Sequence, residues 1–414
     1  MSVQEIAEII KGKEADLIEL RHELHQMPEI GLDLPETQAR LLKALEPYPL
    51  EISTGTKTTS ITAVLRGKAP LPDGTRRPVI LLRGDMDGLP VEEQAPVEYK
   101  STNGNMHGCG HDMHMTVVMG AVHALCEKVD ELVADVVFMF QPGEEGYSGG
   151  QVMIDEGVLD AAGQRVDEAY ALHVFSAGFP GGLMLSKAGP MAAASDNLRV
   201  KVIGTGGHGS APHSANDPVP VACEMVQAIQ TVITRRFDVF DPAVVSVGVL
   251  KAGSALNVIA ESAYFEATVR SFSHETQDRL FELLPQVVHG IAAAHGMRAE
   301  VEMEKLYPPT INDAACYDRT RQMIEELFGE QRFLEPPTPM MGSEDFSFVL
   351  QQVPGCFFGL SAVPAGQDPT TQAYNHSPLA VYDDAVIVDG AAVLAGLAYA
   401  AEPVSYTHLT LPTT

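Results

Sequence analysis

Four short apolar runs that lead directly into polar residues constrain the fold of this chain more than any other feature. The runs cover residues 79–82, 136–140, 169–172 and 357–360. Through the first 190 residues such runs alternate with helical patterns, which is typical of an α/β layer structure. In open α/β sheets the ligand crevice lies at the carboxyl ends of the strands. The sequence therefore predicts an α/β fold with a polar site at one edge of its sheet.

The pattern changes between about residues 192 and 304. Strand-like stretches at 197–202, 244–250 and 263–269 are combined with helical stretches at 218–235 and 274–295. This βαββα order predicts a small α+β domain at 191–305, inserted between the two parts of the α/β domain at 1–190 and 306–403. Residues 404–414 fit neither helix nor core, and we predict that they are a non-native tail.

Charge and length exclude several classes of partner. Lys and Arg number 27 against 55 Asp and Glu, which gives a formal net charge of −28 over 414 residues. Nucleic acids and anionic membranes are bound by clustered Lys and Arg, so we predict neither partner.

No apolar run approaches the roughly 20 residues of a membrane span, and the N-terminus does not have a signal-peptide pattern. Five widely spaced cysteines do not indicate a disulfide framework. We expect a cytoplasmic protein.

The segment at residues 107–114, HGCGHDMH, carries the strongest chemical signal. Cys109 and His111 are separated by one residue just before a helical pattern at 116–128, and the flanking glycines allow a sharp backbone turn. A thiol and an imidazole at this spacing suit a transition-metal ligand pair. The alternative is a histidine-rich loop that only caps the helix through Asp112.

Adjacent carboxylates follow the apolar run at 136–140. Glu144 and Glu145 would repel one another at the end of a buried strand unless a cation neutralised them. A metal supplies that charge, so that one Glu can bind it while the other accepts a proton from a metal-activated water. The alternative is a solvated turn.

Isolated polar residues give weaker signals. His173 follows the run at 169–172, and His376 lies in a polar loop; either could be an ordinary core histidine. Asp85 and Asp87 end a strand, where they could cap a turn or orient a metal-bound imidazole.

A glycine-rich loop at residues 204–213 lies in the predicted inserted domain. It lacks the spacing and the lysine of a phosphate-binding loop, so nucleotide binding is not expected. We interpret the loop as one that presents His208 to a substrate, with a flexible hairpin end as the alternative.

Taken together and in order, these segments resemble the metal-dependent aminoacylase and hippurate hydrolase family. The motifs lie at residues 21–29, 84–90, 107–114, 141–146, 172–173, 206–213, 342–346 and 376–378, and the similarity runs from about 17 to 400. The resemblance implies a mixed-sheet catalytic domain with helices on both faces and a two-metal site. It also implies that the inserted domain is a lid that forms a homodimer.

The resemblance assigns roles to the polar residues of the α/β domain. It implies that Glu144 is the general base and that Asp87 contacts a metal ligand rather than the metal itself. The implied ligands of the two divalent ions are Cys109, His111, Glu145, His173 and His376. This mixed donor set accepts zinc or manganese, and also cobalt or nickel.

Four residues of the lid match family positions near the substrate. His208 matches, better than His213, a histidine that stabilises the oxyanion in the active site of the partner subunit. Asn257 and Arg270 match polar positions near the substrate. One departure is Asn375, which stands where many relatives carry a second histidine.

The resemblance implies hydrolysis of N-acyl-L-amino acids, such as hippurate-like or N-acetyl amino acids, to a carboxylate and a free amino acid. A two-metal dipeptidase or carboxypeptidase is the nearest alternative. Two further classes are a thiol hydrolase with Cys109 as nucleophile and a non-catalytic binding protein on the same fold.

Overall fold

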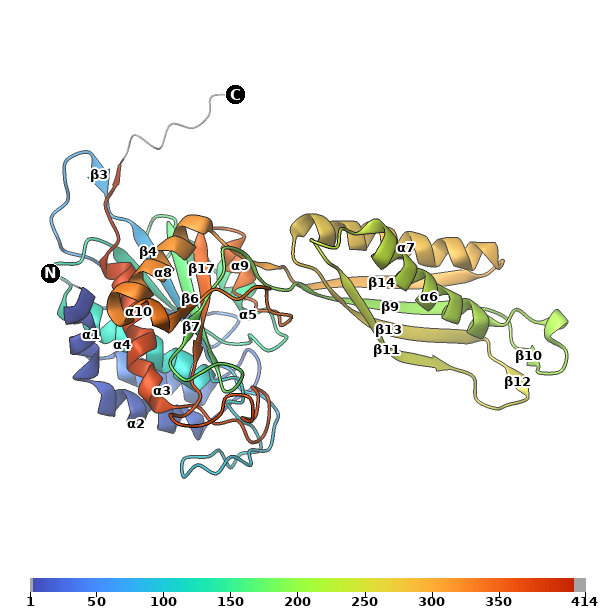
Figure 1. Cartoon of the computed structure of the whole chain (residues 1–414), viewed down its shortest axis with the longest axis horizontal. Helices are drawn as coiled ribbons and strands as arrows, with labels where there is room; N and C mark the ends of the chain where they lie inside the picture. The colour runs from blue at the N-terminus through green and yellow to red at the C-terminus, as the bar shows by residue number, and fades with distance from the viewer. Residues whose placement is uncertain (1–2, 406–414) are drawn as a thin grey trace. The chain divides into compact units, whose positions relative to one another are not determined.

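The computed structural model describes residues 3–405 and divides into two units (Figure 1). The larger unit contains the described residues up to Gly189, then Ile311–Pro337, and those from Phe348 onward. The smaller unit contains Pro190–Thr310 and Thr338–Ser347. The sequence did not predict that residues 338–347 belong to the smaller unit. Backbone hydrogen bonds of Met340 with Met191 and Ala193 hold them there.

An eight-stranded mixed sheet forms the centre of the larger unit, with the order β1-β2-β5-β4-β6-β17-β7-β16. Its strands are β1 (Glu51–Thr54), β2 (Ile61–Leu65), β4 (Val79–Asp85), β5 (Asp135–Gln141), β6 (Glu168–Phe175), β7 (Met184–Leu185), β16 (Phe333–Leu334) and β17 (Gly355–Ser361). The four predicted apolar runs became β4, β5, β6 and β17, which lie next to one another and are parallel. Their carboxyl ends therefore meet at one edge of the sheet.

Helices cover this sheet and share its apolar core. The helices of the larger unit are α1 (Val3–Lys11), α2 (Glu14–His25), α3 (Pro35–Leu45), α4 (His111–Glu127), α5 (Gly149–Asp155), α8 (Ala314–Phe328), α9 (Ser347–Leu350) and α10 (Ile387–Tyr399). A row of fully buried side chains on β5, β4 and β17, including Phe138, Leu82 and Phe358, packs with α1, α4 and α10 in one core. The prediction of a mixed-sheet α/β fold is confirmed.

Helix α4 begins five residues earlier than the predicted helix at 116–128. Gly110 adopts a left-handed conformation with φ 83°, which residues with a side chain rarely adopt, and the helix starts at the next residue. Gly84 lets α4 approach the sheet, since a Cβ there would lie 2.9 Å from the carbonyl oxygen of His114. As a result His111 lies on the first turn of a buried helix rather than in a loop.

A four-stranded antiparallel sheet with two helices forms the smaller unit. Its strands run in the order β11-β13-β9-β14, and α6 and α7 cover one face (Figure 1). The bounds are β9 (Ser195–Ile203), α6 (Pro218–Arg236), β11 (Val244–Ala252), β13 (Ser262–Arg270), α7 (His274–Ala294) and β14 (Arg298–Tyr307). Two short strands, β10 (Gly207–His208) and β12 (Val258–Ile259), pair beyond the sheet. The predicted α+β insertion is confirmed, with β14 as its last strand.

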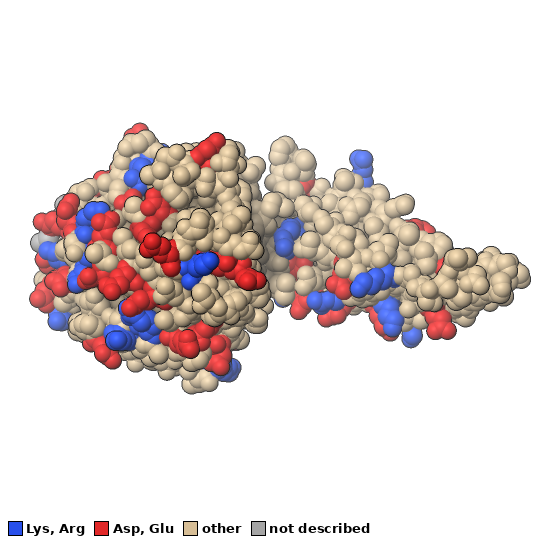
Figure 2. Space-filling view, turned by 90° about the horizontal axis from the view of Figure 1, so that it is seen from below, with Lys and Arg blue, Asp and Glu red and all other residues tan. Residues whose placement is uncertain are grey.

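The remaining strands are short. β8 (Gly189–Ala192) and β15 (Thr310–Asn312) lie where the chain passes between the units, and β3 (Thr75–Arg76) pairs with β18 (Val404–Ser405). The predicted non-native tail at 404–414 falls mainly on residues 406–414, outside the described residues. Within residues 3–405, no helix has both the length and the apolar character needed to cross a membrane. Acidic and basic side chains are interspersed over the face of the larger unit seen in Figure 2.

Candidate metal centre and active site

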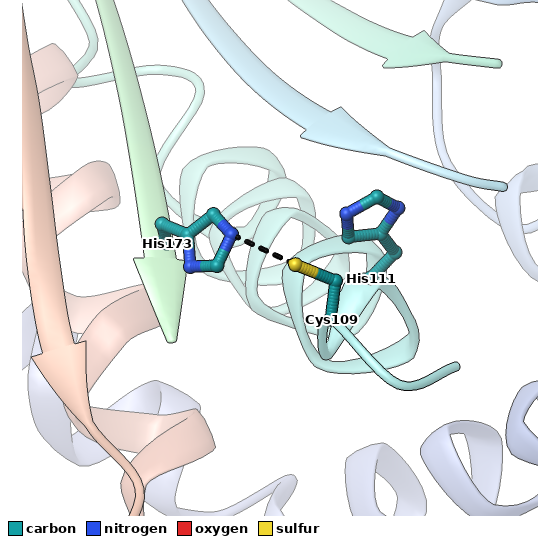
Figure 3. A group of neighbouring side chains, drawn as sticks. All are labelled: Cys109, His111 and His173. Carbon is teal, nitrogen blue, oxygen red and sulfur yellow. Dashed lines mark hydrogen bonds between the residues drawn. The ribbon is translucent and has the colours of Figure 1, made fainter. Parts of the chain in front are cut away.

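Polar side chains gather where the parallel strands of the larger unit end. Asp85 is the last residue of β4, Glu144 and Glu145 follow β5, and His173 lies near the end of β6. Cys109 reaches the same place from the loop before α4 (Figure 3). The predicted site at the carboxyl ends of the strands is therefore assembled from segments that are far apart in the sequence.

The Cys109 sulfur is the common member of two groups of possible metal ligands. It lies 3.3 Å from Nε2 of His173 and 3.2 Å from Nε2 of His376. Nε2 of His376 is also 3.2 Å from a carboxylate oxygen of Glu145. One group is Cys109 with His111 and His173, and the other is Cys109 with Glu145 and His376. Within each group, the ligand atoms lie within 4.8 Å of one another. The structure thus brings the five predicted ligands together, with the Cys109 thiol common to both groups.

Hydrogen bonding prepares His173 to bind a cation through Nε2. Its Nδ1 lies 2.8 Å from the backbone carbonyl of Val174 and must donate, because a carbonyl only accepts. The lone pair is then on Nε2, which faces the Cys109 sulfur (Figure 3). Burial, together with the neighbouring His114 ring, holds the pKa of His173 well below its usual value. A neutral imidazole with its lone pair directed at the centre is the form that binds a metal.

His376 lies among electron-rich groups on a constrained backbone. Hydrogen bonds with Cys109 and Glu145 raise the pKa of His376 to about 10. Its φ of 71° is in the left-handed region, which residues other than glycine rarely adopt and which is typical of functional sites. Donors that attract a proton this strongly also favour a divalent cation.

The buried ring of His111 provides the test of whether the site fits a metal. Neither ring nitrogen makes a hydrogen bond to any residue between 3 and 405, and the side chain is 1% exposed. The nearest carboxylate oxygens, of Asp85 and Asp87, are 3.5 and 3.4 Å away. Burial alone would lower the pKa of His111, but Asp85, Asp87 and Cys109 together outweigh it and raise that pKa well above its usual value. A buried polar group without partners is costly, so a metal on one nitrogen fits this site.

Arg83 and His114 support the centre and were not predicted. Nη1 of Arg83 and Nδ1 of His114 each hydrogen bond one oxygen of the Asp85 carboxylate, both at 2.6 Å. Because Nε2 of His114 accepts the N–H of Val174 at 2.8 Å, its Nδ1 carries the proton donated to Asp85. Both nitrogens of His114 are therefore used, which excludes it as a ligand despite its place near Asp85 and His111. The available signal was Arg83 itself, a charged residue within an apolar strand, which needs a buried partner.

Asp87 organises the turn that carries the carboxylate pair. Its two oxygens accept the backbone N–H groups of Glu144 and Glu145 at 3.0 and 3.1 Å. Glu144 is 7% exposed and lies in one cluster with Glu145 and His111. The structure therefore holds a second carboxylate beside the possible ligands, where it can accept or donate a proton.

His208 and Asn257 lie together beyond the sheet of the smaller unit. The backbone N–H of Ser210 donates to Nδ1 of His208 at 3.1 Å. Because Nδ1 accepts, the proton of the neutral ring is on Nε2, on an exposed side chain. The backbone carbonyl of Asn257 accepts from Gly209 at 2.8 Å and anchors the loop. His213 lies nearby in a short exposed turn.

Arg270 lies at the other end of the same unit. It is the last residue of β13 and hydrogen bonds Ser195, the first residue of β9. At roughly 3.3 Å per residue, β13 separates Arg270 from the loop of His208 and Asn257 by roughly 27 Å. Within one chain, the structure does not bring these predicted substrate contacts together.

The fold and the donor set define a metal-dependent amidohydrolase, and the comparisons identify its family. The chain belongs to peptidase family M20/M25/M40, which it matches over residues 81–400. It is 34% identical to IAA-amino acid hydrolase ILR1-like 2 of Arabidopsis thaliana, over 92% of this chain and 84% of that protein. It is 36% identical to N-acetyldiaminopimelate deacetylase of Enterococcus faecalis, over 84% of this chain and 89% of that one.

A solved structure supports the same placement. The Bacillus subtilis YXEP protein, described as a dinuclear metal-binding peptidase of family M20, superposes with a TM-score of 0.79 at 28% identity, covering 94% of this chain and 98% of that one. The predicted family and the prediction of an amide-hydrolysing enzyme are confirmed.

Proposed function

We propose that the chain hydrolyses N-acyl-L-amino acids to a carboxylate and a free amino acid. The observation that carries the proposal is the cluster of five donors around Cys109 with Glu144 beside it. The names of two relatives describe hydrolysis of an amino-acid conjugate and removal of an acetyl group from an amino acid. Both reactions cleave an amide on the nitrogen of an amino acid.

The proposed ligands are Cys109, His111 and His173 for one divalent ion and Cys109, Glu145 and His376 for the other. When bound, these ions supply a water nucleophile at neutral pH and polarise the amide carbonyl. Zinc or manganese suits this mixture of thiolate, imidazole and carboxylate, and cobalt or nickel is also acceptable.

Glu144 is the proposed general acid and base. Asp87 holds its backbone and Glu145 is the adjacent residue, so its carboxylate stays beside the reacting groups without being needed as a ligand. There it accepts the proton of the attacking water and returns it to the leaving amine, which can then depart as a neutral group.

His208 is the proposed oxyanion donor, supplied by a second copy of the chain. Its Nε2–H is free to donate, and such a donor contributes roughly 2.7–4 kcal/mol to transition-state stabilisation. His208 follows the carboxyl end of β9, whereas Ser195 is the first residue of that strand. β11 is an edge strand of this sheet with an exposed Leu250, and the nearby Leu256 is fully exposed. An open edge of this kind favours pairing with another chain, so we propose a homodimer.

Arg270 and Asn257 are the proposed substrate contacts. A half-buried guanidinium can bind a substrate carboxylate, and an amide can hydrogen bond it. Asn257 lies beside His208, so both would come from the same copy of the chain.

The test is an assay of amine release by the purified chain, after chelation and after addition of Zn²⁺, Mn²⁺ or Co²⁺. Hippurate, several N-acetyl amino acids and several dipeptides are compared. We expect metal-restored hydrolysis of the N-acyl amino acids. Preference for dipeptides would move the proposal to the peptidase alternative. Activity that survives complete metal removal but is lost on alkylation would instead favour Cys109 as a nucleophile.

A further inference from the structure

Asn375, immediately before His376, makes hydrogen bonds through both ends of its side-chain amide. Its Oδ1 accepts from the backbone N–H and from the hydroxyl of Ser176, both at 3.0 Å. Its Nδ2 donates to the backbone carbonyl of Val174 at 2.9 Å, and lies 3.4 Å from that of Cys109. The orientation of the amide is fixed, because a backbone N–H can only donate and a carbonyl can only accept.

These contacts join the three segments that carry Cys109, His173 and His376. The carbonyl of Val174 that accepts from Asn375 also accepts from Nδ1 of His173. The amide therefore holds the group that directs the lone pair of His173 toward the Cys109 sulfur. His376 is covalently attached to Asn375, and its own backbone N–H donates to Gly108 at 2.8 Å.

We propose that Asn375 is a positioning residue that sets the spacing of Cys109, His173 and His376, and thereby the affinity of the centre for metal. A primary amide is required for this arrangement, since it must accept from Ser176 and donate to the carbonyls of Val174, at the same strand end, and of Cys109 in the loop before α4. A carboxylate cannot donate, and an imidazole offers a single nitrogen on each side. Ser176 secures the acceptor side through its backbone N–H, and its single hydroxyl proton is shared between Oδ1 of Asn375 at 3.0 Å and the carbonyl of Ala373 at 2.8 Å.

The test compares metal affinity in Asn375→Leu and in the unaltered chain. Leucine has a similar size and no charge, but it removes every polar contact of the amide, including the one between Nδ2 and the Cys109 sulfur at 3.9 Å. We expect the affinity for Zn²⁺, measured by competition with a chromophoric chelator, to fall roughly 10- to 100-fold, as for other residues that orient metal ligands. The absorption of the Co²⁺-loaded protein due to the cobalt–thiolate bond should shift, because the thiol and the imidazole change their relative position.

The matched control is Gln372→Met, which also replaces an amide by an apolar group in the same loop. The amide of Gln372 contacts Asp368 and Thr371, within that loop, and no proposed ligand. We expect unaltered affinity and an unaltered Co²⁺ spectrum in this control. Thermal unfolding of each metal-free variant checks that the larger unit is folded.

A second variant keeps the test decisive if Asn375→Leu does not fold. Ser176→Ala removes one hydroxyl contact with Asn375 and should weaken Zn²⁺ binding roughly two- to tenfold, the range for one hydrogen bond. Wild-type affinity and spectrum in a folded Asn375→Leu, or in Ser176→Ala if the former is unfolded, would overturn the inference.

The inference rests on the ligand set proposed above and is independent of the substrate. If the unaltered chain bound no metal, the ligand set itself would fail. If it bound metal and the variants bound it equally well, only the role of Asn375 would fail.

Discussion

Replacement of Asp196 should change how the stability of the smaller unit depends on pH. Asp196 is fully buried in β9, where the amide of Gln277 donates to its two oxygens at 2.9 and 3.1 Å. Burial raises the pKa of Asp196 from 3.8 to about 6 in spite of that amide. A carboxyl whose pKa is raised on folding stabilises the fold below its unfolded pKa, and this contribution is lost as the pH rises through its folded pKa. The smaller unit should therefore lose stability between about pH 4 and pH 6.

The size of this effect follows from the pKa shift. A shift from 3.8 to about 6 corresponds to about 3 kcal/mol in the free energy of unfolding. We expect about 2 kcal/mol to be observed, because relaxation and water penetration lower the cost of a buried charge. Asp196→Asn keeps the shape and an oxygen acceptor for Gln277 but cannot ionise. The stability of the variant relative to the unaltered chain should rise by about 2 kcal/mol from pH 4 to pH 7.

The assay must report on the smaller unit alone. Each protein is equilibrated in a series of urea concentrations at each pH and then labelled by a short hydrogen-exchange pulse at one common pH. Peptides from β9 and α7 then give the unfolding midpoint of this unit. As a control, Asp278→Asn removes a surface carboxylate of α7 that pairs with Lys305 at 2.6 Å, and its relative stability should not rise with pH. A stability difference for Asp196→Asn that stays constant across this range would refute the reasoning.

Three further predictions concern catalysis and the frame of the metal centre. Glu144→Gln should retain its metal, measured by elemental analysis, while kcat falls at least roughly 10²-fold; near-normal kcat would exclude Glu144 as the base. Mixing inactive Glu144→Gln with inactive His208→Ala under conditions of subunit exchange should restore activity, since a mixed dimer contains one complete site; a mixture that stays inactive would indicate that His208 does not serve the partner. Asp112→Asn should lower the free energy of unfolding by about 3–5 kcal/mol in urea, because the buried guanidinium of Arg21, now 2.7 Å from Asp112, keeps only the partly exposed Asp384 carboxylate as its countercharge; a loss below about 1 kcal/mol would contradict that estimate.

Local sequence patterns were sufficient to predict the main elements of both units. The apolar runs at 79–82 and 136–140 became β4 and β5 because a strand buried on both faces needs continuous apolar residues. The helix at 218–235 was equally clear, since Asp217 caps its N-terminus and a proline follows. The start of α4 was misplaced because its first turn is fully buried and shows no amphipathic pattern.

The sequence by itself determined which chemical groups are available, since Cys109, His111 and the Glu144–Glu145 pair lie in short motifs whose residue types and spacing suit a metal site. Tertiary structure alone decided how those groups are presented. The proton positions on His173 and His208 and the backbone contacts of Asn375 depend on groups that meet their partners only after folding. The Asn375 contact with Val174 joins residues 201 positions apart, and no local pattern encodes such a pair. Hydrogen bonds of this kind are directional and short, so they follow from the final arrangement of strands and loops rather than from composition or periodicity.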